Sequence, residues 1–268
     1  MRISLVGPGR AGSAVALAAA RAGIEVIDVA GRDPEAVRLL ASAVGARPVD
    51  LDAPVRAADV VLVAVRDDAI EPVSAVLDIA DVGGVAHLSG AASVEALRAL
   101  ATSGVSVGSF HPLQTLPTGE AGAARLAGAW IAITAEEPFR STLRALAGAL
   151  GANPFDLADD AKALYHAAAA AAANFPLAAL TMAYDLFTAA GVPYAAAQPL
   201  VEAVVANAFE LGPRAALTGP VARGDTGTVR TQLAAVAHRV PAWESAFRDL
   251  IVATAHAAGR EAEFGDFS

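Results

Sequence analysis

Strand-like and helix-like segments alternate through the first 155 residues, and this alternation constrains the fold more than any other feature of the sequence. The strand-like runs are short and rich in β-branched residues: Ile3–Val6, Glu25–Val29, Asp59–Val65, Gly84–Leu88, Val105–Phe110 and Trp130–Thr134. The helical patterns between them cover about Ala11–Ala22, Pro34–Val44, Asp68–Ile79, Val94–Ala101 and Pro138–Leu150. Ile3–Val6 and Val60–Val65 are apolar throughout, which is typical of strands that are buried on both faces. The alternation predicts an α/β domain built on a doubly wound parallel sheet.

The pattern changes near residue 155, because no clear strand follows Asp156. Alanine-rich helical stretches take over, at Asp159–Ala190, Pro193–Leu211, Gly227–Arg239 and Pro241–Ala258. We expect Asp159 to cap the first of these helices and Pro176 to kink it. The sequence therefore predicts two domains, an α/β domain at residues 1–155 and an all-helical domain at residues 156–268.

Composition excludes several classes of protein. The chain has 70 alanines and only 5% aromatic residues, so its high apolar content predicts closely packed helices rather than helices that span a membrane. The net charge of −9 argues against a nucleic-acid partner. The chain has no cysteine, which excludes disulfides and cysteine-ligated metals, and we expect no metal site and a cytoplasmic location. Of the 19 Lys and Arg residues, 18 are arginine and one is Lys162, so an arginine needs support from its position before it counts as functional.

Gly7, Gly9 and Gly12 form a G-x-G-x-x-G pattern directly after the first strand and at the start of the first helix. Gly7 permits a tight turn, Gly9 lets the backbone approach a pyrophosphate, and Gly12 lets the helix pack closely on the strand. A pyrophosphate at this turn would meet the free N–H groups of the helix N-terminus. A tight turn without a ligand is the alternative, but the strand–turn–helix context favours a dinucleotide-binding Rossmann domain.

The end of the second strand bears on the choice between NAD and NADP. Asp28 lies 21 residues after Gly7 and would suit the ribose hydroxyls of NAD. Val29 and Ala30 extend that strand, however, so Asp28 falls in mid-strand and Arg32 occupies the loop beyond it, where an arginine pairs with a 2′-phosphate. Asp33 then caps the helix that starts at Pro34. We therefore expect NADP(H) to be preferred over NAD(H).

Several stretches of the chain carry a family resemblance. They are Val65–Ile70, His87–Ala91, Ser109–Thr115, Tyr165–Ala168, Asn174 and Ala216–Asp225. These residues resemble the Rossmann-like proteins that bear the helical C-terminal domain of unknown function 2520. That group is similar to the 6-phosphogluconate dehydrogenase-like superfamily, with its ketopantoate reductases, pyrroline-5-carboxylate reductases and prephenate dehydrogenases. The resemblance implies a Rossmann domain followed by a helical domain, a nicotinamide cofactor, and a homodimer formed through the helical domain. Arg66 departs from the pattern, because the group commonly has proline there.

Candidate catalytic groups follow the predicted strands, because in open α/β sheets the site lies outside the carboxyl ends of the strands. His111 is the first candidate for a proton donor, since histidine titrates near neutral pH, and it also resembles the His-Pro segment of prephenate dehydrogenases. A histidine that only bonds the loop backbone is the equal alternative. Ser89 can hydrogen-bond a carbonyl or the nicotinamide amide, or it can simply form the turn before Gly90. We interpret His87 as structural.

Lys162, His166 and Asn174 share about one third of the circumference of the predicted helix. Ketopantoate reductases carry Lys-x-x-x-Asn on the corresponding helix, with the lysine as proton donor. The resemblance thus implies that Lys162 matches this lysine, while His166 replaces the asparagine and Asn174 binds substrate. The alternative for Lys162 is an ordinary lysine that faces solvent. His166 and Asn174 lie in an alanine run, where polar groups need partners once they are buried.

Thr218 and Arg223 lie in a loop between two helices and are candidates for binding substrate. Arg223 can hold a carboxylate through two hydrogen bonds, or it can form a structural pair with Asp225. Asp225 is equally a candidate N-cap for the next helix. Asn207 is a minor candidate.

These residues and the resemblance together lead to one leading hypothesis. It is an NADPH-dependent reductase that binds a small carboxylate-bearing ketone, with ketopantoate first, in a cleft between the domains. The alternatives are an imine reductase that resembles pyrroline-5-carboxylate reductase, and an NADP(H)-binding sensor without catalysis. The residues expected to contact the cofactor are Gly7, Pro8, Gly9, Arg10, Ala11, Gly12, Arg32, Val65, Arg66 and Ser89.

Overall fold

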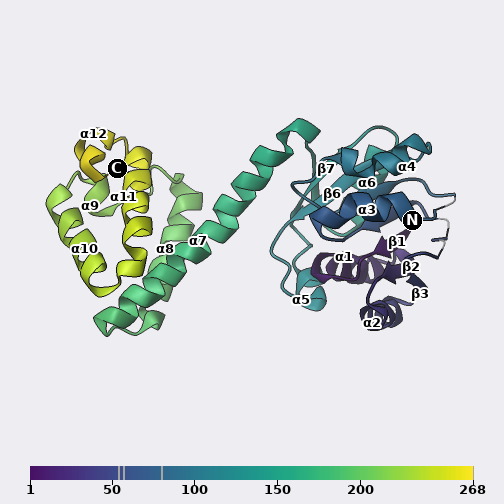
Figure 1. Cartoon of the computed structure of the whole chain (residues 1–268), viewed down its shortest axis with the longest axis horizontal. Coiled ribbons are helices and arrows are strands. Elements are labelled where there is room, and N and C mark those ends of the chain that lie inside the picture. Colours follow the sequence, from purple (N-terminus) through teal and green to yellow (C-terminus); the bar gives the residue numbers. More distant parts are fainter. Residues whose placement is uncertain (54, 57, 80, 268) are drawn as a thin grey trace. The chain divides into compact units, whose positions relative to one another are not determined.

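The computed structural model describes residues 1–53, 55–56, 58–79 and 81–267. They form two compact units, Met1–Ala173 and Asn174–Ser268 (Figure 1).

The first unit is built on an eight-stranded sheet. Its strands are β1 (Arg2–Val6), β2 (Glu25–Gly31), β3 (Arg47–Asp50), β4 (Val60–Val63), β5 (Val85–His87), β6 (Val107–Leu113), β7 (Trp130–Ala135) and β8 (Asn153–Asp156). The strand order is β3-β2-β1-β4-β5-β6-β7-β8. Neighbouring strands run parallel except β6 and β7, which pair antiparallel. The predicted α/β fold is confirmed.

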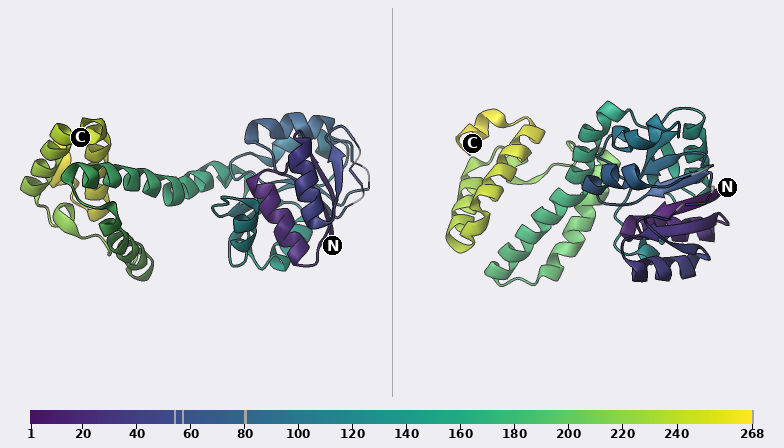
Figure 2. Two further views of the ribbon diagram at one scale, coloured as in Figure 1. Left: turned by 90° about the horizontal axis from the view of Figure 1, so that it is seen from below. Right: turned by 45° about the vertical axis from the view of Figure 1, so that its right-hand side comes forward.

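Helices cover both faces of this sheet (Figures 1 and 2). They are α1 (Arg10–Arg21), α2 (Pro34–Val44), α3 (Asp67–Val76), the 3-10 turn η1 (Val94–Leu97), α4 (Arg98–Thr102), α5 (Gly119–Ala124) and α6 (Phe139–Ala149). Alternate residues of each central strand enter different cores. Ile3 and Leu5 pack with α1, α2 and α6 in one core, whereas Val6 packs with α3, η1 and α4 in the other. The continuous apolar runs therefore reflect burial on both faces.

Three short elements differ from the sequence prediction. The strands β3 and β8 were not expected, because each has four residues and includes a proline, which weakens a strand pattern. The helix α5 was also not expected. It packs on α1, where Gly119 and Gly122 lie against Ser13 and Ala14. The chain then returns along β7, so the sheet is mostly rather than wholly parallel.

The strand order places the switch point of the sheet between β1 and β4. From β1 the chain moves outward through β2 and β3, and it then resumes at β4 on the other side. Ligands of doubly wound sheets bind in the crevice at the carboxyl ends of the strands at such a point. The glycine-rich turn after β1 lies there.

The second unit is wholly helical within the described residues. From the end of the sheet onward the elements are η2 (Asp159–Ala161), α7 (Lys162–Ala190), η3 (Tyr194–Ala196), α8 (Ala197–Leu211), α9 (Gly219–Ala222), α10 (Thr226–Arg239), η4 (Pro241–Trp243), α11 (Glu244–Ala258), α12 (Glu261–Phe264) and η5 (Gly265–Phe267). The core of this unit comprises Val229, Leu233, Ile251, Ala255, Phe264 and Phe267.

The helix α7 begins in the first unit and continues into the second. The chain passes from one unit to the other between Ala173 and Asn174, which lie inside this helix. Pro176 lies inside this helix. Asp159 does not cap it as expected. The Asp159 carboxylate instead accepts hydrogen bonds from the Ser93 hydroxyl and from the Val94 N–H, at 2.9 Å for the latter, so it joins η1 to the start of α7.

Large apolar side chains are exposed on α7 and α8. They are Leu164, Phe175, Leu177, Tyr184, Leu200, Val204, Val205, Phe209 and Leu211. Within the described residues, 159–190 is the one stretch long and apolar enough to cross a membrane by length and composition alone, and one such helix is weak evidence. Asp185 on this stretch accepts a hydrogen bond from the Trp243 indole at 2.6 Å, which ties α7 to η4 within the second unit.

Candidate functional site

The glycine-rich turn has the geometry that its sequence predicts. Gly7 has a φ of +100°, and a Cβ there would lie 2.5 Å from the Ala64 carbonyl oxygen, so only glycine fits. A Cβ at Gly12 would collide with the Gly7 carbonyl oxygen. By contrast, a Cβ at Gly9 would meet nothing closer than 4.0 Å. Gly9 therefore faces open space, as expected of a backbone that a pyrophosphate approaches.

A cavity of about 930 Å³ begins at this turn and runs along the carboxyl ends of β1, β2 and β4. Its lining includes the turn residues Gly7, Pro8 and Gly9, the charged residues Arg32, Asp33, Arg66 and Asp68, and the apolar residues Leu51, Val65, Ala69, Pro72, Val73 and Val76. Six of the predicted cofactor residues thus line one cavity. Arg10, Ala11, Gly12 and Ser89 are not part of this lining. An open glycine turn, two arginines and an apolar slot fit the pyrophosphate, phosphate and adenine of a dinucleotide.

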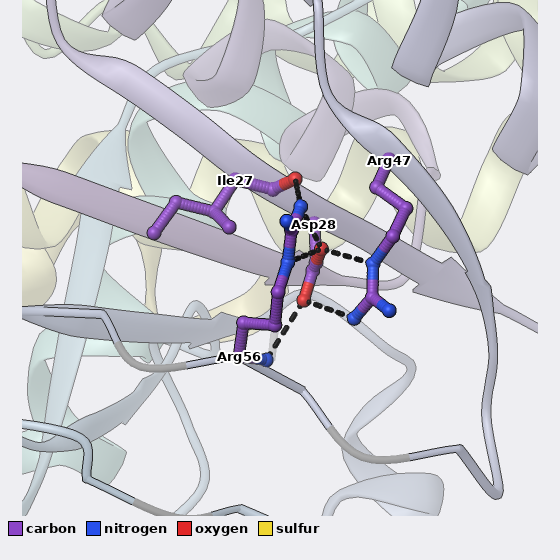
Figure 3. A network of polar contacts seen from close by, with 4 residues as sticks. All are labelled: Ile27, Asp28, Arg47 and Arg56. Carbon is purple, nitrogen blue, oxygen red and sulfur yellow. Dashed lines mark hydrogen bonds and ion pairs between the residues drawn. The ribbon is translucent and has the colours of Figure 1, made fainter.

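Asp28 is fully buried and does not line the cavity. Its carboxylate accepts two hydrogen bonds from the Arg47 guanidinium, both at 2.9 Å, and further bonds from the backbone and side chain of Arg56, the nearest at 2.8 Å (Figure 3). Burial alone would raise the pKa of Asp28, but the bonds from Arg47 and Arg56 outweigh it and hold this pKa below its usual range. The carboxylate ties β3 and the loop before β4 to β2, so it is committed to protein partners.

Arg32 lies in the loop beyond β2, at the cavity, where the sequence places it. The adjacent Asp33 caps α2 as predicted, because its Oδ1 accepts hydrogen bonds from the N–H groups of Glu35 at 3.0 Å and Ala36 at 3.2 Å. Across the cavity, Arg66 forms two hydrogen bonds of 3.1 Å with Asp68. The pKa of Asp68 is lowered first by Arg66 and also by the charge of Arg32. Two cations therefore flank one carboxylate at the end of the cavity that is formed by β2 and β4.

The second group of candidate residues lies further along the same edge of the sheet. Val63, His87 and Ser109 occupy one row across β4, β5 and β6, and His111 projects two residues beyond that row. Because neighbouring strands are about 4.8 Å apart, β5 is about 10 Å from β1 and its glycine turn. His111 packs directly over Gly90, where a Cβ would lie 2.7 Å from the imidazole Cε1. Glycine at position 90 is therefore what lets this imidazole occupy its place.

Lys162 is buried, with 2% of its surface exposed, so it is not the ordinary solvent-facing lysine that we gave as the alternative. Its Nζ donates a hydrogen bond of 2.6 Å to the hydroxyl of Ser109, which is 1% exposed. Burial lowers the pKa of Lys162 from its ordinary value, while the charges of Asp159 and Asp67 oppose that effect. The first turn of α7 thus places an amine with a lowered pKa against β6.

His111 and Tyr165 form the neighbouring pair. The His111 Nδ1 and the Tyr165 hydroxyl are 2.7 Å apart, and the Tyr165 ring also packs against Phe155 on β8. Burial, with smaller effects from the charges of His166 and Lys162, lowers the pKa of His111 to about 4. Burial raises the pKa of Tyr165 to about 12. His111 is therefore neutral at neutral pH, unlike the ordinary histidine on which its predicted role as proton donor was based.

Ser89 and His87 hold the turn after β5. The Ser89 hydroxyl accepts hydrogen bonds from the N–H groups of Ala91 at 3.2 Å and Ala92 at 2.9 Å, so Ser89 forms a local turn. His87 is fully buried, and its Nδ1 accepts a bond of 3.2 Å from the Ser89 N–H. Burial and the charge of Lys162 lower the pKa of His87 to about 4. Ser89 thus takes the turn-forming position that we gave as its alternative, and His87 takes the structural position that we expected.

The remaining predicted residues belong to different units, with His166 in the first and Asn174, Thr218 and Arg223 in the second. His166 is exposed on α7, and its ring centroid lies 6.3 Å from that of His111, so the two histidines are neighbours. Asn174, Thr218 and Arg223 are exposed residues of the second unit, and Asn174 is not buried as its alanine run suggests. Asp225 caps α10 through a hydrogen bond of 3.0 Å from the Thr228 N–H. Within the described residues Arg223 forms no ion pair with Asp225 and acts on it only as a nearby charge.

Sequence reasoning did not assign roles to Ser109, Tyr165 or Asp67. Ser109 and His111 are two residues apart on β6 and so share a face of the sheet, which a strand pattern makes visible. Tyr165 and Lys162 are three residues apart on α7, and this spacing also places them on one face. The pairing of these two faces comes only from the fold. Within the described residues no group of three metal-ligating side chains gathers.

Comparisons with known proteins agree with this arrangement. The family described as NADP oxidoreductase coenzyme F420-dependent matches residues 2–83, and the family described as domain of unknown function DUF2520 matches residues 129–254. A search of curated proteins finds no match.

Solved structures share the fold over nearly the whole chain. A Bacteroides fragilis protein assigned as an NADP oxidoreductase is 23% identical, with a TM-score of 0.78, and the match covers 95% of this chain and 98% of that one. An imine reductase from Myxococcus stipitatus in complex with NADP+ is 17% identical, with a TM-score of 0.67, over 99% of this chain and 95% of that one. A 1-pyrroline-5-carboxylate reductase from Streptococcus pyogenes is 17% identical, with a TM-score of 0.61, over 96% and 98% of the two chains. At these identities the likeness establishes the fold.

The glycine turn, the cavity beside it and the two family matches agree with one another. The chain has a Rossmann-like sheet whose residues 2–83 match the NADP oxidoreductase family, and its residues 129–254 match the DUF2520 family.

Proposed function

We propose that this protein is an NADPH-dependent reductase of a small carboxylate-bearing ketone. The observation that carries the proposal is the buried amine of Lys162, which lies against Ser109 on the same sheet edge as the glycine turn. A reductase needs a cofactor cradle and a proton donor on one edge, and the first unit has both.

The cofactor fits the residues of the cavity. Gly7 and Gly9 would hold the pyrophosphate at the start of α1, and Arg32 would pair with the 2′-phosphate. NADP(H) is favoured over NAD(H) because Asp28, the acid at the NAD position, is already bonded to Arg47 and Arg56. When bound, the nicotinamide supplies the hydride. The residues of this chain bind it, orient the substrate and deliver a proton.

The charge of the site favours a ketone over an imine. A ketone oxygen gains negative charge as hydride arrives, and a nearby ammonium stabilises that charge. An iminium substrate begins positive, so the same ammonium would oppose its binding. Lys162 is also the preferred acid, because its amine lies on Ser109 and burial lowers its pKa from the ordinary value, while His111 is neutral and has no second proton to give.

The resemblance supports one class of substrate. We propose a 2-keto acid, with ketopantoate as the first compound to test, and Arg223 stays a candidate for binding a carboxylate. His166, Asn174 and Thr218 stay candidates for substrate contacts.

An imine reductase is the second candidate, because an imine reductase and a pyrroline-5-carboxylate reductase share the fold. The decisive experiment titrates the purified protein with NADPH and NADH by nicotinamide fluorescence, and then adds ketopantoate or pyrroline-5-carboxylate. NADPH oxidation that depends on ketopantoate supports the proposal. Oxidation only with the cyclic imine transfers the function to the second candidate. Tight NADPH binding without oxidation on a wider panel of ketones and imines would indicate a nucleotide-binding sensor.

We also propose that the protein is a homodimer formed by the helical unit. Its support is the set of exposed apolar side chains on α8, where Phe209 is 91% exposed, because soluble monomers rarely leave such a face open. Light scattering on the eluting protein should give twice the chain mass of 26.8 kDa. Phe209→Glu should reduce it to a single chain, and a wild-type monomer would remove the proposal.

A further inference from the structure

Lys162 is the single lysine of the chain, among 18 arginines. A chain that uses arginine for its other cations has no need of lysine as a surface charge. Lysine differs from arginine in one property that matters here, because its amine can lose a proton within the range of protein pKa values when it is buried. The single lysine is also a buried residue, which points to the amine itself as the required group.

Several elements pack titratable groups around this amine. They are Asp67 at the start of α3, His87 on β5, His111 on β6 and Asp159 in η2. His166 on α7 lies next to His111, with ring centroids 6.3 Å apart. Asp159 is already bonded to the Ser93 hydroxyl and the Val94 N–H. Within the described residues, the hydrogen bond that Lys162 Nζ makes is to the Ser109 hydroxyl, at 2.6 Å. The immediate partner of the buried cation is therefore a neutral hydroxyl.

We propose that Ser109 is a positioning residue that holds the Lys162 amine in its protonated, donor-ready state. The 2.6 Å contact is as short as a charge-assisted hydrogen bond, in which an ammonium N–H donates to oxygen. With one N–H fixed on Ser109, the other two remain to donate to a substrate oxygen. This inference rests on the proposed function only in its last step, the transfer of a proton from Nζ to the alkoxide oxygen. The N–H bond breaks, the O–H bond forms, and the neutral amine regains a proton from solvent.

The physical reason for the effect is a balance between burial and bonding. Burial disfavours the ammonium, and an acceptor at hydrogen-bond distance restores part of what burial removes. Without the Ser109 oxygen, the ammonium form loses this stabilisation relative to the neutral amine, and the pKa of Lys162 falls. A hydrogen bond to a charged group has a strength that corresponds to about one pH unit or more in the titration midpoint.

The test measures the amine directly, without substrate or cofactor. In the full chain labelled with ¹³C- and ¹⁵N-lysine, Lys162 gives the one lysine signal, and its midpoint follows from a pH titration by NMR. Ser109→Ala should lower the midpoint by about one unit. Ser109→Thr retains the hydroxyl and should keep the midpoint near that of the wild type.

Ser4→Ala is the matched control. Ser4 is a fully buried serine on β1 whose hydroxyl has no hydrogen-bond partner within the described residues, so its removal should leave the lysine midpoint unchanged. Ser109→Cys, which has nearly the size of serine but a weak acceptor, carries the test if the alanine variant does not fold. A midpoint that is the same in wild type and in the Ala or Cys variant overturns the inference.

The pH dependence of turnover separates this inference from the proposed function. If Ser109→Ala lowers the NMR midpoint and also lowers the pH at which kcat falls on the alkaline side, then Ser109 acts through Lys162 in the reaction. If it lowers the midpoint while no ketone is reduced by any variant, the positioning role stands and the proposed function fails.

Discussion

The two ends of the site treat charge in opposite ways. At the end formed by β2, β3 and β4, acids and arginines are paired: Asp28 is bonded to Arg47 and Arg56, and Asp68 is bonded to Arg66. At the end formed by β5, β6 and α7, a buried lysine is bonded to a neutral hydroxyl, and two histidines have lost their ordinary basicity. Paired charges remain fixed across neutral pH, so they suit recognition of a phosphate. A buried amine without a paired carboxylate can titrate, so it suits proton transfer.

The strongest way to break this comparison is to remove the amine. Lys162→Met should lower kcat for the ketone by about 10²- to 10⁴-fold, the range of general acid catalysis, while NADPH affinity stays within a few-fold. Lys162→Arg is the matched control, because it keeps the positive charge but its guanidinium does not give up a proton. Steady-state rates and NADPH titrations measure both effects. Full activity in the arginine variant would show that only the charge matters.

The two buried histidines predict a loss of stability in acid. His87 and His111 have pKa values of about 4 in the folded chain, below the ordinary histidine value of 6.5, so the unfolded chain binds more protons between these values. The contribution of the two neutral histidines to the free energy of unfolding is therefore fully present above pH 6.5. It is lost as the pH drops toward 4, by up to about 3 kcal/mol for each histidine. Urea unfolding at pH 7 and pH 4.5 measures the difference. His87→Asn should reduce the difference in unfolding free energy between pH 7 and pH 4.5. A difference as large as that of the wild type would contradict the low pKa of His87.

Arg32 sharpens the comparison from the recognition end. Arg32→Ala should weaken NADPH binding about 10- to 100-fold, as expected for the loss of charge-assisted hydrogen bonds, and leave NADH binding unchanged. Arg38→Ala, on the same chain segment but outside the cavity lining, is a suitable control. Fluorescence titration with both nucleotides gives the two affinities. Equal losses for NADPH and NADH would show that Arg32 does not read the 2′-phosphate.

Replacing Asp28 should have the smallest effect on nucleotide binding of these changes, but it should clearly lower the stability of the fold. Asp28→Asn leaves Arg47 and Arg56 without their carboxylate and should lower stability by about 2 kcal/mol, less than a wholly buried pair because both arginines are partly exposed. The ratio of NADPH to NADH affinity should stay the same. Urea unfolding and nucleotide titration measure the two properties, and a gain or loss of NADH affinity alone would place Asp28 at the ribose after all.

The sequence predicted the parts of this molecule that depend on local pattern. The strands with β-branched runs, the glycine turn and the Asp33 and Asp225 caps all have short-range causes, and they are confirmed. The mid-strand position of Asp28 was also visible, because Val29 and Ala30 extend the strand past it. The four-residue strands β3 and β8 were missed, since at that length neighbouring strands, not side-chain pattern, decide the structure.

The catalytic end was less predictable because it depends on register between distant elements. Nothing near Lys162 in the chain shows that its amine lies on Ser109, 53 residues away. The same holds for Tyr165 and His111, which are 54 residues apart. The low pKa of His111 likewise depends on what covers it, so an isolated histidine after a strand suggests a basicity that the fold removes.

The single buried lysine has a consequence for chemical labelling. Reagents that acylate, cross-link or conjugate proteins through lysine normally react at many surface positions and report little about any one of them. In this chain the other basic residues that carry a fixed charge are 18 arginines, and the one lysine side chain is 2% exposed. A covalent tag on a side-chain amine would therefore mark the opening of the cluster around β6 and α7, and its rate of formation would report how often that cluster opens.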